Sequence, residues 1–227
     1  GYPVEIQYAN NDVNTQIQQI ENMITKGCKI LIIAAIDGSS LTDVLNTAKQ
    51  NNCKVIAYDR LIMQTPNVDY YATFDNYKVG VIQGQYIESK LNLKEGKGPF
   101  NIEIFAGDPG DNNAQFFYNG AMSVLKPYID KGKLIVKSGQ IDFAKCAISN
   151  WTSALAQSRM DNLITSNYTK GEKLDAVLSA NDSLAIGIVA SLKSNGYGTS
   201  AKPYPILTGQ DCDIANVKAI IEGQQSM

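Results

Sequence analysis

The sequence contains no histidine among its 227 residues. This absence excludes serine–histidine–aspartate and cysteine–histidine catalytic sites, and every metal site that uses histidine. Carboxylate or lysine chemistry stays open. Glycine-rich phosphate loops are missing as well, because neither the GxGxxG nor the GxxxxGK[ST] pattern occurs. We therefore expect no cofactor that binds through such a loop and no metal site that uses histidine.

Long apolar runs and clusters of one charge are also missing. No run approaches the roughly 20 apolar residues that cross a bilayer, and no signal peptide is visible. The 20 Lys and Arg residues alternate with 22 Asp and Glu residues, for a formal net charge of −2. Since no basic patch is present, nucleic acid is not an expected partner. The 44% of hydrophobic residues is typical of a globular protein with a substantial core.

Cysteine is scarce, and none of the four cysteines forms a CxxC pair, which argues against a zinc or redox motif. Cys28 and Cys53 each precede a lysine that opens an apolar run. If these runs are parallel neighbouring strands, the two sulfurs start at the same level and a disulfide is geometrically conceivable. Side chains of in-register parallel neighbours point the same way, however, which strains such a bridge. We predict free thiols at both positions.

Alternation of strand and helix patterns runs through the chain. Apolar spacing at Ile17, Ile20, Met23 and Ile24 predicts a helix that Asn11 or Asp12 can cap. The continuous apolar run 29–35 predicts a strand buried on both faces. Strands are further expected over 4–9, 54–58, 70–73, 100–105, 134–137, 176–179 and 206–208, and helices over 14–26, 40–51, 74–91, 114–128, 153–164, 183–195 and 214–222.

This order predicts an α/β fold with parallel sheets and helices on both faces. The units fall into two groups, and the break near residues 71–75 predicts an N-terminal lobe over 1–73 and a C-terminal lobe over 74–227. Ligands of parallel α/β sheets bind at the carboxyl ends of the strands. Polar residues gather at these ends: Asp37, Asp59, Arg60, Asp108, Asp111, Asn112, Asn113, Gln140, Asn181, Asp182, Gln210 and Asp211, with Trp151 after one loop.

Such a set suits a sugar, because each hydroxyl both donates and accepts hydrogen bonds and the C–H face packs on an aromatic ring. Every member also has a structural alternative. Asp37, Asp108 and Asp182 are favoured as helix caps or loop formers. The Asp59–Arg60 pair could be a salt bridge at the rim, Asn112–Asn113 a turn, and Trp151 a core residue. The convergence of these residues carries the hypothesis.

At these residues the sequence resembles the sugar-binding proteins of bacterial ABC importers with the type I periplasmic-binding fold, closest to the xylose-binding and multiple-monosaccharide-binding branch. The likeness covers most of the chain. It rests on the segments QYANND, QIENMITKG, VIAYDRLI, YYATFDNYKVG, KGPFNIEIFAGDPGDNNAQFFYNGAMSVLKPYIDKGKL, AQSRMDNL, DAVLSANDSLAIGIVASL and TGQD.

The resemblance implies two doubly wound parallel-sheet lobes, joined by hinge crossings, that close on one sugar. It assigns the sugar contacts to Asp59, Arg60, Asp111, Asn113, Trp151, Asn181 and Asp211. The family starts with a further strand and helix and continues past this C-terminus, so the chain looks truncated at both ends, with an incomplete first lobe. The implied protein is extracytoplasmic, monomeric and not an enzyme, and it serves a membrane permease or a sensor kinase in import or chemoreception.

Two other classes stay open from the sequence alone. The effector domain of a sugar-responsive transcription regulator shares this fold. An enzyme could use carboxylates such as Asp59 and Asp211. The identity of the sugar also stays open, since a pentose, a hexose and a short oligosaccharide would all suit these residue types.

Overall fold

The computed structural model describes residues 3–227. The chain divides into two compact units. The N-terminal unit comprises the chain up to Phe74 together with Gly110–Asn113, and the C-terminal unit comprises Asp75–Pro109 and Ala114–Met227. The N-terminal unit therefore takes in a short segment from the middle of the sequence.

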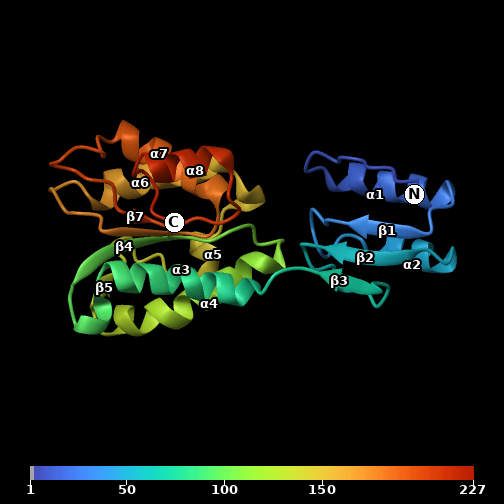
Figure 1. Ribbon diagram of the computed structural model, residues 1–227, viewed down its shortest axis with the longest axis horizontal. Helices are drawn as coiled ribbons and strands as arrows, with labels where there is room; N and C mark the ends of the chain where they lie inside the picture. Colours follow the sequence, from blue (N-terminus) through green and yellow to red (C-terminus); the bar gives the residue numbers. More distant parts are fainter. Residues whose placement is uncertain (1–2) are drawn as a thin grey trace. The chain divides into compact units, whose positions relative to one another are not determined.

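The N-terminal unit is built on a parallel sheet with strand order β1-β2-β3 (Figure 1). Its strands are β1 (Ile30–Ile33), β2 (Lys54–Tyr58) and β3 (Tyr70–Ala72), and its helices are α1 (Val13–Thr25) and α2 (Thr42–Gln50). Asp12 caps α1 as expected, since its Oδ1 accepts from the Thr15 N–H at 2.6 Å. Both helices pack against one face of the sheet, where Leu31, Ile33, Val55 and Ala57 are buried.

The expectation that run 29–35 is buried on both faces is wrong. Ile30 and Ile32 are 59% and 67% exposed, because α1 and α2 cover only the opposite face. The expected strand over 4–9 is also not formed. Its Tyr8 carbonyl accepts from the Gln19 side chain of α1, a contact to a helix that adds nothing to the sheet.

The strands after Cys28 and Cys53 pair in parallel, as predicted. The two cysteines, however, do not lie at the same level along these strands. Ile30 pairs with Lys54, so the two cysteines are offset by one position along the neighbouring strands. All four cysteines are free thiols, as predicted for Cys28 and Cys53.

The C-terminal unit holds a four-stranded parallel sheet of order β5-β4-β6-β7 (Figure 1). Its strands are β4 (Phe100–Phe105), β5 (Leu134–Ile135), β6 (Ala176–Ser179) and β7 (Ile206–Leu207). Its helices are α3 (Asn76–Lys90), α4 (Asn112–Asp130, whose first two residues group with the N-terminal unit), α5 (Phe143–Cys146), α6 (Ser153–Asn167), α7 (Asp182–Ser194) and α8 (Ile214–Ile221), with short turns η1 (Leu93–Glu95) and η2 (Ser149–Trp151).

Alternate residues of these strands enter two separate cores. Ile102 and Ile104 of β4 pack with α3 and α4, whereas Phe105 packs with α6 and α7. The sheet is therefore covered by helices on both faces, as Figure 1 shows, and the doubly wound architecture expected from the sequence is confirmed here. The helices of one layer approach closely: a Cβ on Gly187 of α7 would lie 2.1 Å from the Ser153 carbonyl oxygen of α6.

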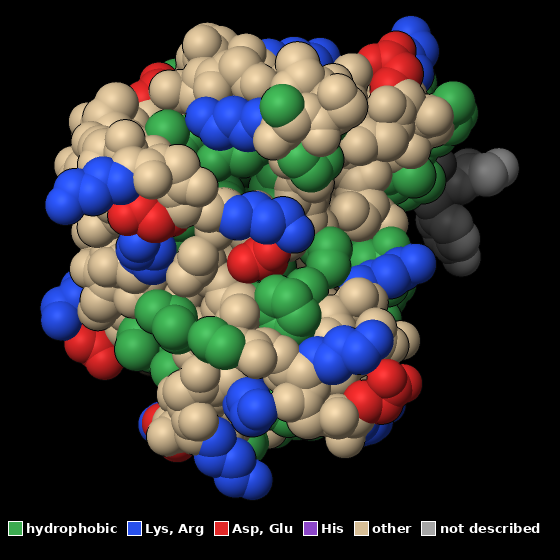
Figure 2. Space-filling model, turned by 90° about the vertical axis from the view of Figure 1, so that its left-hand side faces the viewer, with side chains coloured by type: hydrophobic (Ala, Val, Ile, Leu, Met, Phe, Trp, Pro, Cys, Tyr) green, Lys and Arg blue, Asp and Glu red, His purple; other side chains and the backbone are tan. Residues whose placement is uncertain are grey.

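Within residues 3–227, no helix combines the length and apolar character that crossing a bilayer requires. Acidic and basic side chains are interspersed on the face that Figure 2 shows. That face carries no continuous basic patch of the kind that binds nucleic acid.

Candidate functional site

Asp59 stands directly after β2 with a left-handed backbone, at φ 62°. Its carbonyl oxygen accepts from Thr73 Oγ1 at 2.9 Å, from Asn113 Nδ2 at 3.1 Å and from the Tyr71 hydroxyl at 3.2 Å. Three donors on one carbonyl fix the backbone, while the Asp59 residue itself is exposed. The Asp59 carboxylate is thus held at the carboxyl end of the sheet, where a ligand can reach it.

Arg60 pairs with Asp111 rather than with the adjacent Asp59. Its Nε lies 3.0 Å from Asp111 Oδ2, and its Nη1 donates to the carbonyl of Ile36 at 3.1 Å. Asp111 Oδ1 accepts from the Asn113 backbone N–H at 2.9 Å. A guanidinium fixed on two sides presents its donors in a defined direction, which suits recognition of hydroxyl oxygens.

Tyr71 and Thr73 were missed by the sequence reasoning. Burial raises the pKa of the Tyr71 phenol, so the hydroxyl stays protonated and can donate to Asp59. The only available signal was their place on and after β3, the strand next to β2.

Trp151 closes the η2 turn with φ 53°, next to Asn150 at φ 54°. Its ring lies close against Gly107, where a Cβ would come within 1.9 Å of a ring carbon. An edge of the ring meets Phe117, with centroids 6.3 Å apart. Trp151 is half-buried and packs against the hydrophobic core of the C-terminal unit, so its role as a platform for a sugar stays a prediction.

Asn181 and Asp211 meet in the C-terminal unit. Asn181 caps α7, where its Oδ1 accepts from the Leu184 N–H at 3.1 Å, and its Nδ2 donates to Asp211 Oδ2 at 3.2 Å. The side-chain amide of Asn181 therefore caps α7 with its oxygen and binds Asp211 with its nitrogen. Asp211 is exposed and has φ 112°, and Cys212 follows at φ 65°.

The favoured alternative for Asp37 and Asp108 is confirmed, since both shape loops. Asp37 Oδ1 accepts from the Ser39 N–H at 2.7 Å, and the Asp108 carboxylate accepts from the Asn150 N–H. Gln140, at another strand end, binds Arg159 of α6 through its side-chain oxygen at 2.8 Å.

Three of the seven predicted contacts share one backbone property: Asp59, Trp151 and Asp211 all have positive φ. Side chains other than asparagine and aspartate rarely adopt this conformation, and φ 112° lies outside the usual left-handed region. Such strain persists only where surrounding contacts impose it, and it concentrates at ligand sites. The role of these three positions in sugar binding stays a prediction, because positive φ also occurs at residues outside the predicted site: Asn10, Asn11, Asn52, Gln64, Asn92, Asn150 and Cys212.

Each unit thus carries its own group of polar side chains. The N-terminal unit joins Asp59, Arg60, Asp111 and Asn113 through direct contacts, and the C-terminal unit joins Asn181 to Asp211 and holds Trp151. Carboxylates, amides and a guanidinium pair with hydroxyl groups in either direction, and the indole offers an apolar face. Across residues 3–227, no group of three His, Cys, Asp or Glu side chains could hold a metal ion.

Comparison with known proteins finds a match over residues 1–227 to the periplasmic binding protein domain. The multiple sugar-binding periplasmic protein SbpA of Azospirillum brasilense is 57% identical over 99% of this chain and 63% of its own length. The multiple sugar-binding periplasmic receptor ChvE of Rhizobium radiobacter is 59% identical over the same shares, 99% and 63%. The chain thus spans 63% of the length of both relatives.

A solved structure gives the same result. An ABC transporter solute-binding protein from Clostridium phytofermentans, with bound β-D-glucose, has a TM-score of 0.95 and 59% identity, and the match covers 99% of this chain and 68% of that one. These relatives are named as sugar-binding or solute-binding proteins, and the two curated ones are periplasmic by name, in agreement with the predicted class and location. The resemblance seen in the sequence is confirmed, and the chain belongs to the periplasmic binding protein domain family.

Proposed function

We propose that this chain is the sugar-binding part of an extracytoplasmic solute-binding protein that captures a monosaccharide without transforming it. We assign to sugar binding Asp59, Arg60, Asp111 and Asn113 in the N-terminal unit, and Trp151, Asn181 and Asp211 in the C-terminal unit. The observation that carries the proposal is the contact network of the N-terminal unit, in which Arg60 Nε lies 3.0 Å from Asp111 Oδ2 and Asn113 Nδ2 donates to the Asp59 carbonyl at 3.1 Å. It gathers carboxylates, an amide and a guanidinium, the groups that pair with sugar hydroxyls, at one strand end.

D-Glucose is the first sugar to test. The glucose-bound protein from Clostridium phytofermentans is 59% identical to this chain over the matched residues, and the names of the two curated relatives describe binding of several sugars. A site made of carboxylates, amides and one guanidinium recognises hydroxyl groups that differ little between glucose, galactose and xylose. We propose that the chain accepts more than one pyranose.

The proposed partner is a membrane permease of the ABC type, because the solved relative is an ABC transporter protein. A sensory role is the second proposal, as one curated relative is named a receptor. The regulator alternative gains no support from these relatives, which are periplasmic or transport proteins.

Titration calorimetry of the full chain with D-glucose, D-galactose and D-xylose tests the proposal. We expect saturable binding of glucose with one site per chain, and no loss of sugar after prolonged incubation. Asp211→Ala should weaken binding strongly. Asp130→Ala is the matched control, because Asp130 is an exposed carboxylate of α4 paired only with Lys126. Absence of binding for every sugar would overturn the proposal.

A further inference from the structure

Asp182 is a buried carboxylate, 3% exposed, at the first position of α7. Of the two roles expected from the sequence, cap or loop former, the structure shows the second, since the α7 cap is Asn181. Asp182 makes its contacts elsewhere. Its Oδ2 accepts from the Asp213 N–H at 2.9 Å, and its own N–H donates to the Gln210 carbonyl at 2.9 Å. One residue therefore binds both ends of the turn that carries Asp211.

This turn is strained at its two central residues. Asp211 has φ 112° and Cys212 has φ 65°, and both side chains are exposed. Without fixed ends, a chain with these residues would relax toward negative φ. The two bonds of Asp182 hold the ends at the separation that this conformation requires, so the direction of the Asp211 carboxylate depends on them.

Further buried side chains hold the Asp182 carboxylate itself. Gln225 Nε2 donates to Asp182 Oδ1 at 3.0 Å, and Asn216 Nδ2 donates to Gln225 Oε1 at 2.7 Å and to the Asp182 carbonyl at 3.0 Å. Space is tight here, since a Cβ on Gly209 would lie 2.3 Å from Asp182 Oδ1. Every donor around the carboxylate faces an oxygen, so the site requires a side chain that only accepts.

We propose that Asp182 is a positioning residue that holds the strained turn Gln210–Asp213 and thereby directs Asp211 to the sugar. The inference rests on the proposed function and deepens it, because it assigns part of the sugar affinity to a residue that does not touch the ligand. Asp182→Asn preserves the shape but places an NH₂ group against one of two donors, Gln225 Nε2 or the Asp213 N–H.

A double-mutant cycle tests this role through glucose affinity. Asp182→Asn should weaken binding about tenfold in the parent chain, as expected for a loss near 1.4 kcal/mol. In the Asp211→Ala background the same substitution should change affinity less than about twofold, because the residue it directs is gone. A purely structural role would lower affinity by the same factor in both backgrounds, and that result would overturn the inference.

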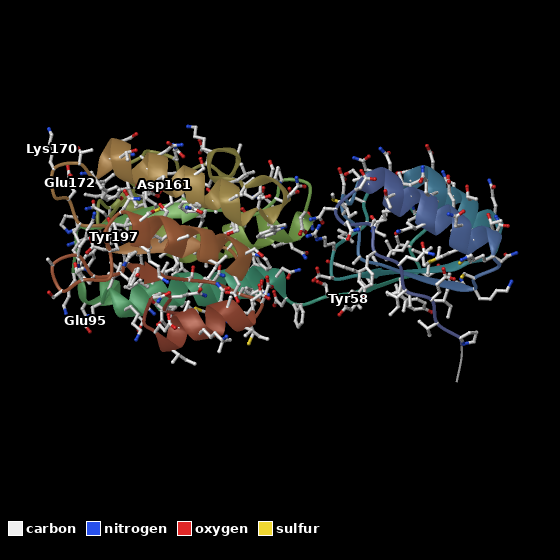
Figure 3. The ribbon with its side chains drawn as sticks, turned by 90° about the horizontal axis from the view of Figure 1, so that it is seen from above. Tyr58, Glu95, Asp161, Lys170, Glu172 and Tyr197 are labelled. Carbon is white, nitrogen blue, oxygen red and sulfur yellow. The ribbon has the colours of Figure 1, made fainter. Side chains whose placement is uncertain are left out.

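Hydrogen exchange of the peptide over residues 209–217 supplies a readout independent of sugar. We expect faster exchange in Asp182→Asn, since the Asp213 N–H loses its acceptor. Unchanged exchange would also overturn the inference. The control is Asp161→Asn. Asp161 of α6 (labelled in Figure 3) accepts hydrogen bonds from the side chains of Ser191 and Asn195 of α7, so this variant removes a carboxylate that lies between two helices.

The two proposals fail in different ways. If the parent chain binds no sugar, the proposed function is wrong and the assignment of Asp182 to sugar affinity falls with it. If the parent chain binds glucose but the cycle is additive, sugar binding stands and the role of Asp182 is wrong.

Discussion

Arg60 Nε lies 3.0 Å from Asp111 Oδ2, in a pair whose side chains are 27% and 4% exposed. The two residues are far apart in the sequence yet belong to the same compact unit. Asp111 is almost fully buried, so its charge needs this partner. The guanidinium in turn is oriented by a fixed carboxylate, which makes it a directional donor.

Arg60→Ala should weaken sugar binding by roughly 2–4 kcal/mol, because a charged donor is lost and Asp111 is left without its ion pair. Arg60→Lys should lose an intermediate amount, since a lysine keeps the charge but not the planar fork. Titration calorimetry with glucose measures both. Lys126→Ala is the control, as Lys126 forms an exposed ion pair with Asp130 on α4. An unchanged dissociation constant for Arg60→Ala would remove Arg60 from the site.

Trp151 is the only tryptophan of the chain, so its fluorescence reports on one position. If the half-buried ring packs on the sugar, saturating glucose should change its emission intensity or wavelength, because the exposed part of the ring loses contact with water. Trp151→Phe should abolish the signal and weaken binding, since the smaller ring offers less apolar area. A spectrum that stays flat while calorimetry detects binding would place Trp151 outside the site.

Local patterns were sufficient for most of the fold. The strands 54–58, 100–105 and 176–179 were predicted to the residue, because short, largely apolar segments bounded by polar turns are distinctive. The failures have tertiary causes. Ile30 and Ile32 are apolar on a face that α1 and α2 leave uncovered, and nothing in the run 29–35 itself reveals how many helices cover the strand.

The candidate site was likewise predictable from local sequence only in part. Strand ends and the family resemblance named Asp59 and Asp211, since both follow directly from local sequence. Their positive φ and the residues that impose it, such as Thr73 for Asp59 and Asp182 for the turn of Asp211, depend on contacts across the fold. A carboxylate at a helix start looks like a cap in the sequence, and only the neighbouring turn shows what Asp182 binds.

Glu103 gives the protein a predicted dependence of stability on pH. This fully buried carboxyl of β4 accepts from the Ser138 hydroxyl at 2.6 Å and from the Tyr168 hydroxyl at 2.9 Å. Burial raises its pKa above the ordinary value of 4.5, despite these hydrogen bonds. The folded state therefore binds the proton more tightly than the unfolded state, and the free energy of unfolding should decrease as the pH rises from 4.5 through the raised pKa.

Thermal unfolding of Glu103→Gln and the parent chain across this pH range checks the prediction. The variant should lack this decrease, since its side chain does not ionise, so the difference in melting temperature between the two should change with pH in that window. Glu95→Gln is the control, because the Glu95 carboxylate is 66% exposed in the turn after α3 (Figure 3). Parallel pH profiles for the parent and Glu103→Gln would contradict the prediction.

The four thiols differ in access, which predicts an order of reaction. Cys212 is exposed in the turn of Asp211, whereas Cys146 is buried and burial raises its pKa to about 11. Cys53 is also buried, and its pKa is raised first by burial and then by the nearby Cys28 thiol. Because the thiolate is the reactive form, a disulfide reagent near pH 8 should modify Cys212 quickly in the folded protein and leave Cys53 and Cys146 unmodified.

Counting thiols in the denatured, unreduced protein completes this test. Four reactive groups are expected, since all four cysteines are free thiols and the one-position offset between the strands separates Cys28 from Cys53. Cys212→Ser should remove the fast phase of the folded protein and lower the denatured count by one, which identifies the exposed group. A count of two for the unmodified chain would mean that a disulfide exists, and Cys28 with Cys53 would be the first pair to examine, because they enter neighbouring strands.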